Sequence, residues 1–117
     1  MTLDGKWAAV EAELGGNKMP NAVVSSVHLT ISENNYTARV AGVTDKGKLS
    51  LNTDLVPATV DIVGTDGPNK GKTIIAILRR AANELLICFN LSGVDYPEEF
   101  TTQAGPQLFL VKYRRRS

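Results

Sequence analysis

Turn-forming residues punctuate this chain at short and regular intervals, and runs of β-favouring residues lie between them. Gly15-Gly16-Asn17, Glu33-Asn34-Asn35, Asp45-Lys46-Gly47 and the segment from Asp66 to Gly71 are the clearest of these turns. Such spacing is typical of an all-β sandwich or barrel. No segment with a helical period is long enough to connect parallel strands, so antiparallel neighbours joined by hairpins must dominate the sheet.

The runs between the turns predict the strands. Residues 27–32 alternate most cleanly, with Val27, Leu29 and Ile31 on one face. The expected strands are residues 5–14, 27–32, 36–40, 48–53, 58–63, 72–78, 85–90 and 108–113. About eight antiparallel strands suit an up-and-down barrel whose interior is either filled by side chains or holds one small ligand. Residues 19–26 are expected to form either a short helical turn or a loop that crosses a barrel end, and residues 91–107 a long loop, all in a single domain spanning residues 1–117.

Charge and cysteine content exclude several kinds of partner. The 13 basic and 12 acidic residues give a net charge of +1, so no global field attracts nucleic acid or a membrane surface. The basic end from Arg114 to Arg116 is too short for a nucleic-acid footprint and is interpreted as a solvated tail. No apolar stretch approaches the roughly 18 residues that span a bilayer. Without a signal peptide the chain is expected to be cytoplasmic, and a removed leader is the alternative.

No group of residues has the makings of a catalytic or metal site. The segment from Gly67 to Thr73 resembles a phosphate loop, but it has Asp66 where that motif needs glycine, and a β-branched run follows it instead of a helix. His28 is expected to face solvent on its strand, and Cys88 to be an inert, buried thiol. Adjacent Glu98 and Glu99 fit a solvated loop. The sequence therefore predicts a protein that is not an enzyme and has neither a cofactor nor a metal.

A set of motifs, in order along the chain, resembles a known family. Gly5-Lys6-Trp7 matches the Gly-x-Trp that opens lipocalin-type barrels. The motifs that follow it are Gly16-Asn17-Lys18-Met19-Pro20, Gly67 to Thr73, Leu85-x-Ile87-Cys88-Phe89 and Tyr96-Pro97-Glu98-Glu99-Phe100. Together they resemble a small bacterial lipocalin-like family of the calycin type, abundant in planctomycetes and without an assigned function. The resemblance implies an up-and-down barrel closed at one end by Trp7, with Lys112 or Arg114 of the last strand over the indole.

The first functional hypothesis is a non-enzymatic binding module that holds a small apolar ligand inside the barrel. The side chains expected to line the ligand are Trp7, Leu29, Ile31, Tyr36, Val60, Ile62, Phe89, Phe100 and Leu110. The alternative is a protein-interaction or structural module whose barrel core is packed solid.

Three late strands bear on that alternative because they are apolar on both faces. They are residues 74–78, 85–89 and 108–111. A barrel wall in water should alternate between apolar and polar residues, so either another segment, such as the N-terminal one, covers this wall or the wall forms a homodimer interface.

Overall fold

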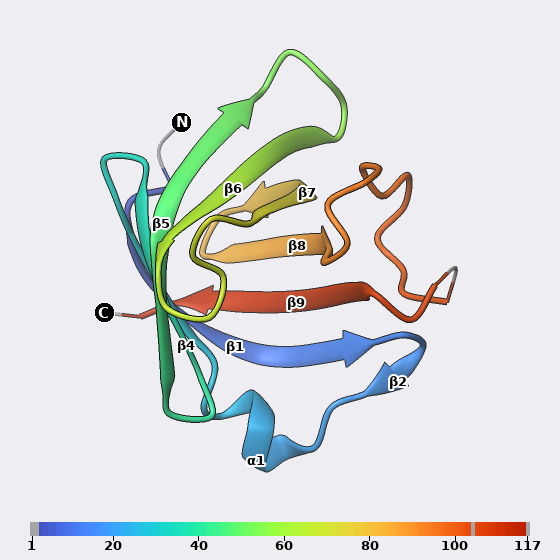
Figure 1. The fold of residues 1–117 in the computed structure, drawn as a ribbon. Coiled ribbons are helices and arrows are strands. Elements are labelled where there is room, and N and C mark those ends of the chain that lie inside the picture. Colours follow the sequence, from blue (N-terminus) through green and yellow to red (C-terminus); the bar gives the residue numbers. More distant parts are fainter. Residues whose placement is uncertain (1–2, 104, 117) are drawn as a thin grey trace.

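The computed structural model describes residues 3–103 and 105–116, and nearly all of its regular structure is β (Figure 1). The elements are β1 (Gly5–Leu14), β2 (Asn17–Lys18), α1 (Asn21–Val24), β3 (His28–Ser32), β4 (Asn35–Val40), β5 (Val43–Asn52), β6 (Ala58–Asp66), β7 (Thr73–Ala81), β8 (Glu84–Asn90) and β9 (Leu108–Arg115). Across the described residues, no helix has the length and apolar character needed to cross a membrane.

The strands form a closed antiparallel barrel, which confirms the expected fold class. Each strand from β3 to β9 pairs with the next one along the chain, and β1 pairs with both β3 and β9. Eight strands therefore close the barrel, while the short β2 pairs only with the last two residues of β1. The pairing of β1 with β9 shifts register between Ala9 and Glu11, so that Val10 forms a bulge. Figure 1 shows β1 and β9 lying side by side at this closure.

The turn predicted at Asp45-Lys46-Gly47 is wrong, and the correction adds a carboxylate to the barrel interior. The chain reverses at Ala41-Gly42, where both residues have positive φ angles of 52° and 82°, and not at Asp45-Lys46-Gly47, which lies within β5. Gly47 serves close packing instead of a turn, because a Cβ there would lie 2.6 Å from the Tyr36 ring and 2.1 Å from a β6 carbonyl oxygen. The carboxylate of Asp45 is thereby placed on a strand that lines the barrel.

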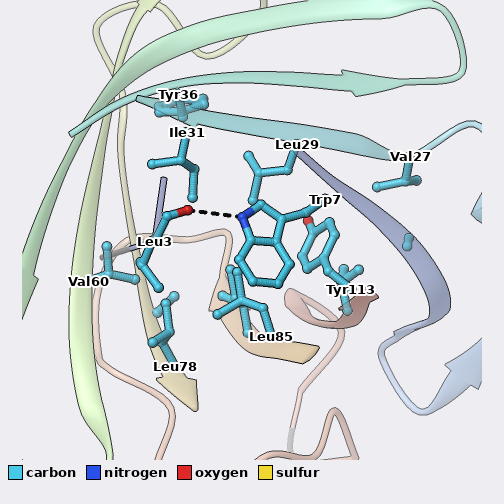
Figure 2. Packing of buried hydrophobic residues seen from close by; sticks show 14 of the residues in the cluster. Leu3, Trp7, Val27, Leu29, Ile31, Tyr36, Val60, Leu78, Leu85 and Tyr113 are labelled. Carbon is cyan, nitrogen blue, oxygen red and sulfur yellow. Dashed lines mark hydrogen bonds between the residues drawn. The ribbon is translucent and has the colours of Figure 1, made fainter. Parts of the chain in front are cut away.

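Inward-facing apolar side chains from all eight barrel strands form the core. Trp7 is fully buried, and Figure 2 shows its indole among Leu29, Leu85 and Tyr113. The alternation predicted for residues 27–32 is present, since Leu29 and Ile31 are buried while Thr30 and Ser32 are exposed. The helical turn within residues 19–26 is also found, as α1.

The apolar outer wall of β7, β8 and β9 is covered by the protein's own β8–β9 connection. We call this connection, residues 91–103 and 105–107, the strap; it is the long orange segment in Figure 1. Beneath it Ile77 and Cys88 face outward yet are 2% and 0% exposed. The Cys88 thiol donates to the Thr101 carbonyl, and the Arg79 guanidinium lies 5.0 Å from the centroid of the Phe100 ring.

Polar contacts fasten the strap at both of its margins. On one side the Tyr96 hydroxyl donates to Asp61 of β6. On the other, the buried Thr102 hydroxyl donates to Glu13 of β1 at 2.5 Å and accepts from the Gly16 backbone N–H at 2.7 Å. The strap, and not the N-terminal segment, is therefore what covers this wall.

Candidate ligand-binding cavity

A cavity of about 220 Å³ lies inside the barrel. Its wall is almost entirely aliphatic and aromatic. It extends from Leu3, Leu78 and Tyr113 near one end of the barrel to Val40 and Val43 beside the β4–β5 turn at the other. The two ends differ in construction, and the difference decides which end of the cavity is open.

Trp7 seals the first end. Its indole N–H donates to the Leu3 carbonyl at 3.0 Å, a bond drawn in Figure 2. The Arg115 guanidinium lies 4.4 Å and that of Arg80 5.9 Å from the indole ring centroid, within the range of cation–π attraction. Gly5 is required here, because its φ is +141° and a Cβ would lie 2.2 Å from the Arg115 guanidinium. The Gly-x-Trp motif thus makes room for the cation that covers the indole.

The cation over the indole is therefore corrected from Lys112 or Arg114 to Arg115. Arg115 is the β9 residue paired with Trp7, and in an antiparallel ladder paired residues share a face. Lys112 and Arg114 occupy the opposite face and lie 3.4 Å and 3.8 Å from the Glu84 carboxylate. The β-bulge in β1 sets this register.

The second end is an open mouth with an apolar rim. Val40, Val43 and Leu91 line the cavity there and are 39%, 52% and 44% exposed. The β6–β7 loop, residues 67–72, contributes Pro68 and Asn69 to the same lining. Large apolar side chains that reach both a cavity and solvent mark the point at which an apolar ligand would enter.

Asp45 holds the β6–β7 loop against the mouth. Its carboxylate accepts from the Asn69 side-chain amide at 2.7 Å and from the Asn69 backbone N–H at 3.3 Å. It also hydrogen-bonds with the Tyr36 hydroxyl. Burial, followed by the charge of Asp45 and this hydrogen bond, raises the pKa of Tyr36 to about 12. Tyr36 therefore remains a neutral donor at neutral pH.

Six of the residues expected to line a ligand lie on the cavity wall, and three lie elsewhere. The six are Leu29, Ile31, Tyr36, Val60, Ile62 and Phe89. Trp7 packs at the sealed end and is not part of the wall. Phe100 belongs to the strap outside the barrel, and Leu110 points outward into a small groove with Leu86 and Lys112.

Sequence reasoning missed the polar members of the site. Asp45 was assigned to a turn because Asp-Lys-Gly is a common turn sequence, and Asn69 lies in a loop with no distinguishing signal. Of the two reactive residue types in the chain, cysteine lies outside the site, whereas histidine contributes to the cavity lining. Cys88 lies beneath the strap, where burial raises its pKa. The prediction that His28 faces solvent is corrected: it is half-buried, it contributes to the cavity lining, and its buried Nδ1 atom has no hydrogen-bond partner within the described part of the chain.

Within residues 3–103 and 105–116, no three His, Cys, Asp or Glu side chains gather in a way that would hold a metal ion. Comparison of the chain with protein-family models, with curated proteins and with solved structures gave no significant match. The case for a function therefore depends on the cavity and on the residues around its mouth.

Proposed function

We propose that this protein is a non-enzymatic binding module that holds a small, largely apolar ligand inside the barrel, and that it is lipocalin-like in kind. The observation that carries the proposal is the 220 Å³ cavity with an almost wholly apolar wall. A cavity needs only about 10–15 Å³ of such volume to hold one water, so this interior is not packed solid. Burial of apolar ligand surface against this wall supplies the free energy of binding.

The cavity volume bounds the size of the ligand. An apolar cavity of about 150 Å³ takes up benzene, so 220 Å³ corresponds by proportion to about nine non-hydrogen atoms. A longer molecule fits if one end leaves through the mouth between Val43 and Leu91. An alkyl chain of about eight carbons with one polar group has about nine non-hydrogen atoms and can place its polar end at the mouth.

The competing hypothesis of a solid core and a homodimer through the outer wall has less support. The sequence suggested a homodimer because three strands are apolar on their outer face. In the structure the strap covers that face. The requirement of this hypothesis for a filled interior is at odds with the cavity.

Titration calorimetry with octan-1-ol tests the proposal. We expect the unmodified protein to bind one molecule with a micromolar Kd. Ala38 lies on the cavity wall, so Ala38→Phe places a ring in the space that the ligand needs and should weaken binding at least tenfold. The matched control is Thr37→Phe, one residue earlier on β4 and directed to the outer face.

Thermal unfolding of both variants separates loss of the cavity from loss of the fold. Binding that survives in Ala38→Phe, or that is lost equally in Thr37→Phe with both variants folded, would reject an interior site.

A further inference from the structure

We propose that Asp45 makes the cavity selective by charge: it accepts an amphiphile whose polar end is a neutral or cationic hydrogen-bond donor and discriminates against a carboxylate. This inference rests on the proposed binding function and names the ligand class of the same site. Its basis is the polar cluster of Tyr36, Asp45 and Asn69 on an otherwise apolar wall.

Acidic and basic residues are unequally represented on the cavity wall. Among the described residues that line it, Asp45 is the only acidic one, and none is lysine or arginine. The guanidinium groups of Arg80 and Arg115 lie over the Trp7 ring at the sealed end and are not part of the lining. An anionic ligand head would therefore meet a like charge, and no lysine or arginine on the cavity wall would offset it; His28 supplies the one imidazole among the described lining residues.

The hydrogen bonds at Asp45 and Tyr36 also favour a ligand group that donates over one that only accepts. An ionised carboxylate has about four acceptor positions. At Asp45 three donors occupy such positions: the Asn69 backbone N–H, the Asn69 side-chain amide and the Tyr36 hydroxyl. About one acceptor position is left over. Because the Tyr36 O–H already bonds to Asp45, its oxygen too can only accept from a ligand. The carboxylate and the phenol therefore present acceptors, which a hydroxyl or ammonium group satisfies and a carboxylate does not.

The position of the cluster sets the direction of the ligand. Asp45 is two residues from the exposed rim residue Val43 and is half-buried. The wall farther in, at Val60 and Leu78, is apolar. The polar head of an amphiphile is thus placed at the mouth beside Asp45, and its chain extends toward the Trp7 end. Apolar surroundings weaken dielectric screening, so the charge of Asp45 acts more strongly there than it would on an open surface.

Three ligands of nearly equal size test the selectivity by calorimetry at pH 7.5: octan-1-ol, octylammonium and octanoate. We expect octan-1-ol and octylammonium to bind at least tenfold more tightly than octanoate. Asp45→Asn removes the charge and nearly keeps the shape, so the preference for octylammonium over octanoate should fall at least tenfold. Asn69→Ala is the matched control, because it removes the side-chain amide bond to Asp45 but keeps the charge, and the preference should persist.

The outcomes separate the two proposals. If octanoate binds as tightly as octylammonium to the unmodified protein, the selectivity is wrong while the binding function stands. If none of the three ligands binds, both proposals fall together. A preference that is unchanged in a folded Asp45→Asn protein would also overturn the role of Asp45. If that variant does not fold, the order of affinities in the unmodified protein decides the question.

Discussion

The two ends of this barrel are built from the same strands but differ in almost every other respect. At the sealed end two connections are short, with only two residues between β3 and β4 and between β7 and β8, and residues 53–57 join β5 to β6. At the mouth lie the segment from β1 to β3, the two-residue β4–β5 turn, the longer β6–β7 loop and the start of the strap. A buried Trp7 closes one end, whereas exposed Val40 and Val43 border the other. Stability is thus concentrated where the strands are tied together, and the loops are left to shape a site.

The largest loss of stability is expected from a substitution at the sealed end. Trp7→Ala should lower the free energy of unfolding by about 3–5 kcal/mol, because it leaves a large void and removes the surface beneath two guanidinium groups. Val43→Ala, at the rim, should change it by less than about 0.5 kcal/mol. Urea unfolding measures both values, and similar losses at the two positions would contradict the division of roles.

A smaller loss of stability is expected when the cation that covers the indole is replaced. Arg115→Met keeps an apolar stem but loses the contact with Trp7 and the hydrogen bond to the Asp4 carbonyl, so it should cost about 1–2 kcal/mol. Arg114→Met loses only an exposed ion pair with Glu84 and should cost less than about 0.5 kcal/mol. The reverse order in urea unfolding would indicate that Arg114, and not Arg115, is the cation that stabilises the sealed end.

The smallest effect distinguishes the tyrosines of the two ends. Asp45→Asn should lower the pKa of Tyr36 from about 12, although not to 10, since burial remains its main cause. It should leave Tyr113 unchanged, because burial alone raises the pKa of that residue. Alkaline absorbance titration, with Tyr36→Phe to assign the signal, measures this shift. A fall in the Tyr113 pKa instead would show that the two ends are coupled.

The same pKa has a consequence for stability. The folded state holds the Tyr36 proton more tightly than the unfolded chain, for which the pKa is 10.0. The stability carried by neutral Tyr36 is therefore present below pH 10 and is lost as the pH rises toward 12.

Much of the barrel was predictable because local patterns encode it. Alternation placed Leu29 and Ile31 inside, and the turn residues divided the chain into hairpins. The doubly apolar strands also indicated that something covers the outer wall. What covers it was not readable, because the strap has no periodic pattern and its contacts, such as that of Thr102 with Glu13, join residues far apart in sequence.

The wrong predictions of the cation over Trp7 and of the turn at Asp45-Lys46-Gly47 have a common cause, which is the pairing register between strands. A single bulged residue, Val10, determines which β9 side chain faces Trp7, and nothing in the sequence marks it as a bulge. Asp-Lys-Gly satisfies turn preferences, yet Gly47 is needed where Tyr36 packs against β5. Both features depend on contacts between strands, which local propensity does not contain. The polar cluster around Asp45 was missed for the same reason.

The most direct test of the cavity as a ligand site is a crystal structure with 8-bromooctan-1-ol, using anomalous scattering to locate the bromine. The bromine is expected inside the barrel near Val60 and Leu78, with the hydroxyl beside Asp45 at the mouth. Bromine found only on the outer surface, or an interior that stays empty at saturating ligand, would contradict a barrel that holds its ligand inside.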